Sequence, residues 1–248
     1  MSVRVAWYSQ GMIDVPLDDR WLSRREAAWV SRMRFEKRRS EFRLGRWTAK
    51  NAIALFLGRP RSPPDLQVVE IDRAPDGAPA PLIEGMRAPA SISMTDRADQ
   101  AVCVVAAPRL GLGVDLELVE PRSEAFVADY LTAGERRLVG EASSREGRDV
   151  RANLIWCAKE SALKVLRTGL RRDTRSVEVS FPDAPSVDGW APIAVRSIVG
   201  ACYSGWWRRY GAFILTVAAT EAVLPPDPLV DPPGLATAVP AHAWLRRL

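Results

Sequence analysis

Acidic residues at two places in the sequence have a spacing that could bind a divalent metal ion. Asp115 and Glu117 lie two residues apart in a strictly alternating segment that predicts a strand, so both carboxylates leave the same face. Glu160 and Lys164 lie four residues apart in a predicted helix and share one face. Three carboxylates without histidine or thiolate suit Mg²⁺, which commonly bridges protein carboxylates to phosphates. The set therefore indicates a magnesium site for a phosphate-containing substrate.

Each part of this set also has a purely structural interpretation. Asp115 and Glu117 could form an ordinary solvated strand face, although a strand that follows a buried strand is an unusual place for bare acids. Glu160 and Lys164 could form a surface ion pair worth about 0.3–0.5 kcal/mol. The combination of the two pairs is what favours the metal site.

Imidazole chemistry is excluded by the composition. The only histidine, His242, is the seventh residue from the C-terminus, in a proline-rich stretch. Catalytic triads, Cys–His pairs and His-ligated zinc sites therefore lack their central residue. The three cysteines, Cys103, Cys157 and Cys202, lie far apart in apolar surroundings, which predicts inert buried thiols in a reducing compartment.

Two long helices are expected to position the acidic residues and their surroundings. Apolar residues at helical spacing predict one helix over about 32–57 and a second over about 149–167. Shorter helical segments are expected over 22–30 and 123–139, strands over 3–8, 66–71, 90–93, 101–107, 114–118, 177–181, 193–203 and 210–218, and a hairpin around 206–209.

The order of strand, long helix and strands occurs twice along the chain. It predicts an α+β fold of two similar α/β halves related by a pseudo-twofold, each a long helix packed on a small, mostly antiparallel sheet. No residue-level repeat supports this pattern. We expect an N-terminal half over 1–111, a C-terminal half over 112–222 with the metal and catalytic residues, and a proline-rich tail over 223–248 that packs on the surface or is partly mobile.

Length and composition agree with a folded soluble protein. The 248 residues allow one large domain or two of about 120 residues. Apolar residues make up 47% and charged residues 26%, so disordered and fibrous classes are excluded. No apolar segment approaches the ~20 residues of a membrane span, and no apolar leader is visible, so we expect a cytoplasmic protein.

Positive charge is concentrated in two segments. Residues 32–50 contain eight basic residues and two acids, a local charge of +6, and residues 167–175 contain four arginines and one acid, a local charge of +3. Within the first segment Arg39, Arg43, Arg46 and Lys50 form a stripe on one helix face. These patches predict a phosphate-rich or acidic partner. Nucleic-acid binding is an alternative use of such a helix, but no nucleic-acid module accompanies it.

The motifs resemble those of a known family. GVDLE at 113–117 and WCAKESALK at 156–164 look like the two signatures of the 4′-phosphopantetheinyl transferases, (V/I)G(V/I)D-x-E and W-x-x-K-E-(S/A)-x-x-K, and their order and separation also fit. RRSEFRLGRWTAK at 38–50 is similar to the family's upstream helix, and DGAPAP at 76–81 precedes SIS at 91–93 as in the family. The resemblance covers about residues 1–220 and points to the larger Sfp-like form, with two halves in one chain.

The resemblance implies Mg²⁺-dependent transfer of the phosphopantetheine arm of coenzyme A to a serine of an acyl or peptidyl carrier protein, with release of 3′,5′-ADP. Asp115, Glu117 and Glu160 match the metal-binding acids, with Mn²⁺ as an alternative ion. Glu160 or a metal-bound water would take the serine proton, and Lys164 would neutralise the pyrophosphate and protonate the leaving group. The family context is polyketide or nonribosomal peptide biosynthesis, and two halves in one chain favour a monomer.

The resemblance also implies residues that contact coenzyme A and the carrier protein. The first half would hold the nucleotide of coenzyme A, and the cofactor-binding candidates are Arg38, Arg39, Arg43, Arg46, Ser93, Met94, Thr95, Lys159 and Lys164. For Lys159 a surface position is the alternative. The carrier protein is expected to be an acidic helical domain. Its contact candidates are Phe126, Tyr130, Leu131, Arg171 and Arg172, for which plain surface or core positions are the alternatives.

The sequence departs from the family pattern on the nucleotide side. Met94 stands where the family has a histidine that contacts coenzyme A, and Ala78 stands where it has the lysine of a GKP sequence. A thioether cannot donate a hydrogen bond to a phosphate. Three interpretations stay open: a transferase that uses arginines instead, a transferase with weaker coenzyme A affinity or another donor, and a relative that binds carrier proteins without transfer. The intact Asp115, Glu117, Glu160 and Lys164 argue against the last.

Overall fold

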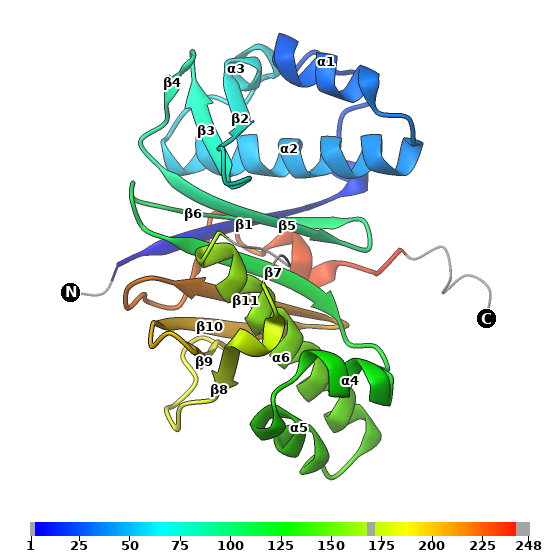
Figure 1. Ribbon diagram of the computed structural model, residues 1–248. Helices are drawn as coiled ribbons and strands as arrows, with labels where there is room; N and C mark the ends of the chain where they lie inside the picture. The colour runs from blue at the N-terminus through cyan, green and yellow to red at the C-terminus, as the bar shows by residue number, and fades with distance from the viewer. Residues whose placement is uncertain (1–2, 168–171, 242–248) are drawn as a thin grey trace. The chain divides into compact units, whose positions relative to one another are not determined.

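The computed structural model describes residues 3–167 and 172–241, and the chain falls into two compact units. Among the described residues, the N-terminal unit comprises Val5–Arg109 and 227–241, and the C-terminal unit comprises Leu110–Pro226 with Val3 and Arg4. Both units contain helices and sheets, which confirms the α+β class (Figure 1). Within the described residues, none of the helices is both long and apolar enough to cross a membrane.

The N-terminal unit is built on the long helix α2 (Glu36–Phe56). Around it are β1 (Val5–Gly11), α1 (Arg24–Arg32), α3 (Pro63–Gln67), β2 (Val69–Arg73), β3 (Pro79–Ile83), β4 (Met86–Arg87), β5 (Ser91–Arg97), β6 (Gln100–Ala106) and β12 (Asp227–Pro228). The strands form one sheet in the order β12-β1-β6-β5 and another in the order β2-β3-β4. Figure 1 shows α2 along one face of the larger sheet. Ala49 and Ile53 of the predicted apolar stripe pack there with Cys103 and Val105.

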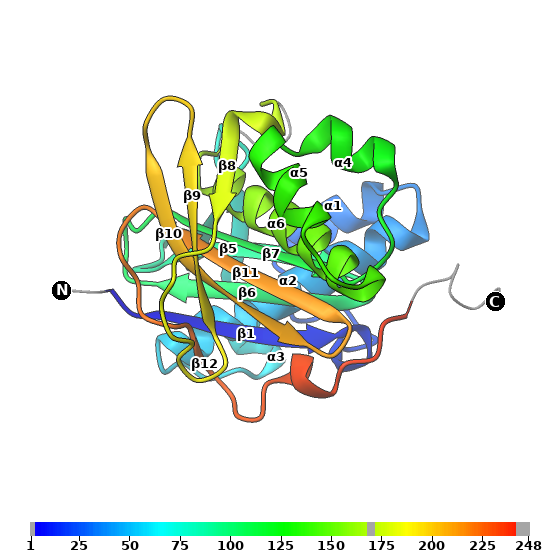
Figure 2. The ribbon, with the colours of Figure 1, turned by 90° about the horizontal axis from the view of Figure 1, so that it is seen from below.

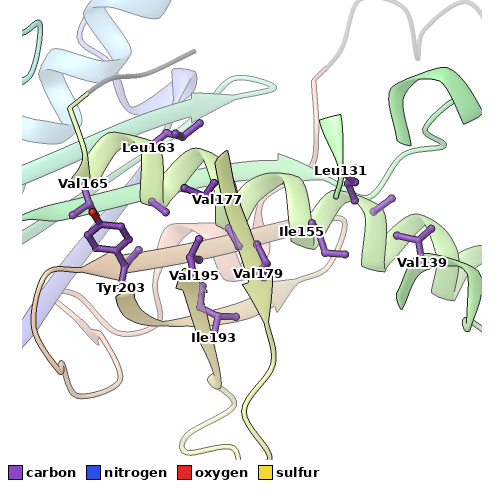
Figure 3. Close-up of a cluster of buried hydrophobic side chains, with 14 of the residues drawn as sticks. Leu131, Val139, Ile155, Leu163, Val165, Val177, Val179, Ile193, Val195 and Tyr203 are labelled. Carbon is purple, nitrogen blue, oxygen red and sulfur yellow. The ribbon is translucent and has the colours of Figure 1, made fainter. Parts of the chain in front are cut away.

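The C-terminal unit is built on the long helix α6 (Arg145–Val165). Its other elements are β7 (Leu112–Leu118), α4 (Glu124–Tyr130), α5 (Ala133–Gly140), β8 (Val177–Ser180), β9 (Ala191–Ser197), β10 (Cys202–Tyr210) and β11 (Phe213–Ala219). The strands form one antiparallel sheet in the order β7-β11-β10-β9-β8. Figure 2 shows α4 and α5 beside one end of α6. Apolar side chains of α6 and the sheet form the core drawn in Figure 3.

Local capping and turn residues explain where the boundaries differ from expectation. The helical segment 123–139 is two helices, because Thr132 caps α5 through a capping box with Glu135. The strand 193–203 is two strands separated at Gly200, whose φ is 90°. The hairpin lies at Gly211, with φ 57°, and not around 206–209, which belongs to β10. Cys202 is exposed, so only two of the three thiols are buried as expected.

The described part of the proline-rich segment packs onto the N-terminal unit. β12 runs parallel to β1, with Ala6 opposite Asp227. Leu235 is buried, and its backbone N–H donates to the Ser9 hydroxyl over 2.9 Å. Residues 227–241 therefore form part of the fold, whereas His242 lies outside the described residues.

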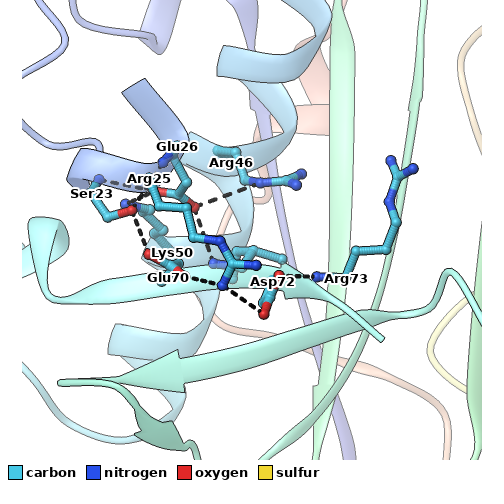
Figure 4. Close-up of polar contacts among 9 residues, drawn as sticks. Ser23, Arg25, Glu26, Arg46, Lys50, Glu70, Asp72 and Arg73 are labelled. Carbon is cyan, nitrogen blue, oxygen red and sulfur yellow. Dashed lines mark hydrogen bonds and ion pairs between the residues drawn. The ribbon is translucent and has the colours of Figure 1, made fainter. Parts of the chain in front are cut away.

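A buried carboxylate organises the junction of α1, α2 and β2 (Figure 4). Glu26 lies in the first turn of α1 and is 0% exposed. Its two oxygens accept hydrogen bonds from the backbone N–H groups of Ile71 and Ser23, both over 3.0 Å, and Lys50 Nζ lies 2.5 Å from Oε2. The Ser23 hydroxyl in turn donates to Glu70 over 2.6 Å. One side chain thereby ties two helices to a strand.

The same arrangement recurs in the C-terminal unit. Glu135, also 0% exposed, accepts from the backbone N–H groups of Val179 and Thr132, both over 2.8 Å, and pairs with Lys159 over 2.7 Å. The Thr132 hydroxyl donates to Glu178 over 2.8 Å. Each glutamate precedes its lysine by the same separation in sequence, and each lysine ends a W-x-A-K sequence, at 47–50 and at 156–159. The expectation that the chain lacks a residue-level repeat is therefore wrong.

Candidate active site

Strand β7 and helix α6 approach each other closely at Gly113. A Cβ atom at Gly113 would lie 1.8 Å from the backbone carbonyl oxygen of Ser161. Further along β7, Asp115 pairs with Thr216 of β11, whose hydroxyl donates to the Cys157 carbonyl of α6 over 2.9 Å. These contacts hold the acidic strand directly against the helix that carries Glu160 and Lys164.

The variant Gly113→Ala is expected to be strongly destabilised because the added methyl group meets backbone that cannot rotate away. Such overpacking costs about 1–3 kcal/mol in protein cores, and we expect the upper end of that range here. Urea unfolding measures the loss. Gly140→Ala is the matched control, since a Cβ at Gly140, the last residue of α5, meets nothing within 4 Å. Equal unfolding midpoints for the two variants would contradict the close approach.

Lys164 neutralises the first acid of the site. Its Nζ donates to Asp115 Oδ1 over 2.8 Å and to the Val114 carbonyl over 2.7 Å. Burial alone would lower the pKa of Lys164, but the ion pair with Asp115 and the charge of Glu160 outweigh it and raise the pKa. Lys164 therefore stays a cation next to the acids.

Glu117 is held through both carboxylate oxygens. The indole N–H of Trp156 donates to Oε1 over 2.9 Å, and Arg122 donates to Oε2 over 3.2 Å. Arg122 is itself fixed by Asn153, whose Oδ1 accepts from its Nε over 2.7 Å. This carboxylate therefore has a defined orientation and a compensating charge.

Glu160 is the least satisfied acid of the site. Its Oε1 atom is buried and has no hydrogen-bond partner among the described residues. Burial raises the pKa of Glu160 to about 7, and the negative charges of Asp115 and Glu117 add to this effect. The positive charge of Lys164 opposes it. Glu160 is therefore near enough to Asp115 and Glu117 for their charges to act on it.

The carboxylates suit a divalent metal by the chemistry of their donors. All are oxygen ligands of the kind that Mg²⁺ prefers, and the buried, unpartnered oxygen of Glu160 is a natural ligand atom. Among the described residues, however, no group of three or more His, Cys, Asp and Glu side chains is arranged so that it could hold a metal ion. Lys164 pairs with Asp115 and Arg122 pairs with Glu117, so both β7 acids have a cationic partner.

The structure contradicts the expected role of Lys159. Its side chain is 0% exposed, so it is neither a phosphate contact nor a surface lysine. The ammonium pairs with Glu135 and donates to the carbonyl oxygens of Thr174 and Val177 over 3.0 and 2.7 Å. All three protons of Lys159 are therefore directed at protein atoms.

All three arginines of the basic stripe pair with carboxylates of their own unit. Arg39 and Arg43 form bonds of 2.8 Å to Glu36 and Asp19, and Arg46 lies 3.6 Å from Glu26. Burial lowers the pKa of Arg46 despite this charge. Lys50, the fourth residue of the stripe, is fully buried. The four residues of the stripe therefore contact groups of their own unit, whereas Arg38, outside the stripe, is exposed.

The residues around the missing histidine lie on β5. Ser93 is buried, whereas Met94 and Thr95 are partly buried. Met94 packs on the apolar core next to α2, where its methyl group would lie 3.1 Å from a Cβ placed at Gly45. The side chain at position 94 thus fills space beneath the helix.

The predicted partner contacts divide into surface and core residues. Phe126 is partly buried and Tyr130 is 40% exposed. Leu131 is 1% exposed and packs near Val139 and Ile155, so its expected contact with a partner is wrong (Figure 3). The Leu131 side chain, at the C-terminal end of α4, packs into the core. Arg172 is partly buried, and Arg171 lies outside the described residues.

Two residues of the site have no role in the sequence-based expectations. Trp156 shares a helix face with Glu160 and Lys164 but has no expected function, and Arg122 is not among the expected residues at all. Arg122 lies five residues beyond Glu117, just before the Ser123 helix cap. A basic residue so near an acidic pair is the one sequence signal that could have identified it.

Comparison with known proteins shows which class of enzyme this part of the chain resembles. Residues 111–193, from β7 through α6 into β9, match the sequence model of the 4′-phosphopantetheinyl transferase superfamily. The expected resemblance and the expected class of enzyme, a phosphopantetheinyl transferase, are confirmed. Enzymes of this class use coenzyme A and generally a divalent metal ion, and they act on carrier proteins.

One similar solved structure is the crystal structure of the holo-[acyl-carrier-protein] synthase of Thermotoga maritima. It is 23% identical in sequence, and the likeness covers 53% of this chain and 76% of that one, with a TM-score of 0.34. A TM-score this low does not establish a shared overall fold. No curated protein matches the chain at a significant level.

Proposed function

We propose that the protein transfers the 4′-phosphopantetheine arm of coenzyme A to a serine hydroxyl of an acyl or peptidyl carrier protein and releases 3′,5′-ADP. Asp115, Glu117 and Glu160 would hold Mg²⁺, with Mn²⁺ as a substitute. The observation that carries this proposal is the buried, unpartnered oxygen of Glu160 beside two further acids and the ammonium of Lys164. A carboxylate in this state is suited to bind a cation or to accept a proton.

In the proposed reaction, the serine oxygen attacks the phosphorus that carries the pantetheine. The bond from that phosphorus to the oxygen of the 3′,5′-ADP moiety breaks as the new bond forms. Glu160 takes the serine proton, and Lys164 neutralises the pyrophosphate and gives a proton to the departing phosphate. When bound, the metal ion would stabilise the negative charge that develops on the phosphate oxygens.

The N-terminal half is proposed to hold the nucleotide. Arg38 is the first candidate for a phosphate contact because it is exposed, whereas Arg39 and Arg43 would have to exchange their carboxylate partners for phosphate. Ser93 and Thr95 remain polar candidates on β5. We place the protein in the Sfp-like subtype, as a cytoplasmic monomer that serves polyketide or nonribosomal peptide synthesis, with metal and catalytic residues in 112–222.

A carrier-binding relative without transferase activity is the second candidate. The position of Met94 favours it, since an apolar side chain packed under α2 provides no donor for coenzyme A. The four intact residues of the metal and proton-transfer site favour the transferase.

One assay separates the two candidates. The purified protein is incubated with coenzyme A, Mg²⁺ and apo carrier domains, and the carriers are analysed by intact mass spectrometry. We expect the mass of one added phosphopantetheine, loss of the product with EDTA, and recovery when Mg²⁺ or Mn²⁺ is restored. Carrier binding without a mass change would support the second candidate, and an unmodified series of carriers would contradict the transferase.

A further inference from the structure

Trp156 is the residue of the WCAKESALK motif that the proposed reaction leaves without a role. It lies on α6 one turn before Glu160, and its indole N–H donates to Glu117 Oε1 over 2.9 Å. The ring packs at steep angles against Phe126 and Tyr130, with centroid distances of 5.1 and 5.2 Å. Two aromatic neighbours therefore fix the direction in which the indole N–H points.

We propose that Trp156 is a positioning residue that orients the Glu117 carboxylate for metal binding. The inference rests on the proposed function, because it takes Glu117 as a metal ligand. Residues that hydrogen-bond to ligating carboxylates set the ligand orientation, and their loss typically weakens metal binding about 10–100-fold. Trp156 holds Oε1 of Glu117 through a hydrogen bond, and this fixes the orientation of the whole carboxylate, including Oε2.

The neutrality of the donor distinguishes Trp156 from Arg122. Both donate to Glu117, but the guanidinium of Arg122 brings a full positive charge to Oε2, over 3.2 Å, which competes with a metal ion. The indole N–H holds Oε1 without removing the negative charge that a metal ion needs. Trp156 can therefore keep its bond to Glu117 while a cation binds the carboxylate.

The chain contains a matched control for this hydrogen bond. The indole N–H of Trp206, on β10 of the same unit, also donates over 2.9 Å and is also partly buried. Its acceptor is the Val223 carbonyl oxygen, a backbone atom with no role in the acidic site. Phenylalanine at either position keeps one aromatic ring and removes the second ring with its N–H, so Trp156→Phe and Trp206→Phe lose the same volume and one 2.9 Å hydrogen bond each.

The experiment measures metal binding directly. Mn²⁺ is titrated into each protein without coenzyme A, and free Mn²⁺ is followed by electron paramagnetic resonance. We expect Trp156→Phe to bind Mn²⁺ about tenfold more weakly than the unsubstituted protein, and Trp206→Phe to bind it equally well. In the transfer assay, the half-saturating Mg²⁺ concentration should rise by the same factor for Trp156→Phe, with the rate restored at saturating Mg²⁺.

The outcomes separate this inference from the proposed function. Unchanged Mn²⁺ binding by Trp156→Phe, or an equal loss in Trp206→Phe, overturns the positioning role and leaves the transferase untouched. Failure of the unsubstituted protein to bind Mn²⁺ overturns the proposed metal site and this inference together. If Trp156→Phe does not fold, NMR of the unsubstituted protein tests the inference instead. The indole ¹H–¹⁵N resonance of Trp156 should shift when Mg²⁺ is added, while that of Trp206 should not. An unchanged Trp156 resonance overturns the inference.

Discussion

Replacing Glu160 with glutamine is expected to lower the rate of phosphopantetheine transfer by at least about 10³-fold, because the variant loses the proposed proton acceptor and one metal ligand together. The fold should survive. Burial and the charges of Asp115 and Glu117 disfavour the Glu160 carboxylate, so a neutral amide of the same shape removes an unfavourable charge. We therefore expect the urea midpoint of Glu160→Gln to equal or exceed that of the unsubstituted protein.

The control for this variant lies on the same helix. Glu146, in the first turn of α6, is exposed and forms a 3.0 Å ion pair with Arg209. Glu146→Gln should change neither the transfer rate nor the stability by a large amount, since exposed ion pairs contribute about 0.2–1 kcal/mol. Transfer by Glu160→Gln at the unsubstituted rate would reject both roles proposed for Glu160.

The second large effect concerns stability. Lys159→Met is expected to cost about 3–5 kcal/mol in the free energy of unfolding, because it leaves the fully buried carboxylate of Glu135 without its cation. Lys50→Met should also destabilise the N-terminal unit, but by less, because it removes the nearer of two cations and leaves Arg46 at 3.6 Å from Glu26. Urea unfolding, followed by circular dichroism and tryptophan fluorescence, measures both losses.

Lys37 provides the comparison for these two buried lysines. Its side chain is 87% exposed and lies 3.8 Å from Glu41, one helical turn away. Lys37→Met should therefore change the free energy of unfolding by no more than about 0.5 kcal/mol. If Lys159→Met costs no more than Lys37→Met, the buried pair does not stabilise the unit in the way described.

The acidic site could be predicted from sequence because its geometry is local. A period of two residues places Asp115 and Glu117 on one face of β7, and a period of four places Glu160 and Lys164 on one face of α6. The ion pair between Lys164 and Asp115 then follows from the packing of those two elements. The close approach that permits it depends on Gly113, and that role is visible only in the structure.

Buried partners from distant segments could not be predicted in the same way. Lys159 lies between Ile155 and Ala162 on the apolar face of α6, so helical spacing implies its burial. Its partner Glu135 lies earlier in the chain on another helix, and only the Thr132 capping box marks that position in the sequence. In the sequence, Lys159 therefore resembles a phosphate ligand because it is next to Glu160. In the structure it is a core residue.

The carboxylate partners of the α2 arginines could not be predicted for a related reason. Counting charges along one helix cannot include carboxylates that other segments bring to it. Asp19 and Glu26 come from the chain before α2 and from α1, and they pair with Arg43 and Arg46. The helical spacing of the stripe was right, but its free charge was overestimated.

The repeated buried lysine and glutamate also give the molecule an internal reference. When the two W-x-A-K sequences are aligned, the positions that match Glu160 and Lys164 are Asn51 and Leu55, and β1, a strand that contacts α2, contains no acidic residue. The N-terminal unit thus keeps the scaffold without the clustered charges. Comparing the two units within one polypeptide can therefore separate the free energy contributed by the shared scaffold from the cost of holding three carboxylates together.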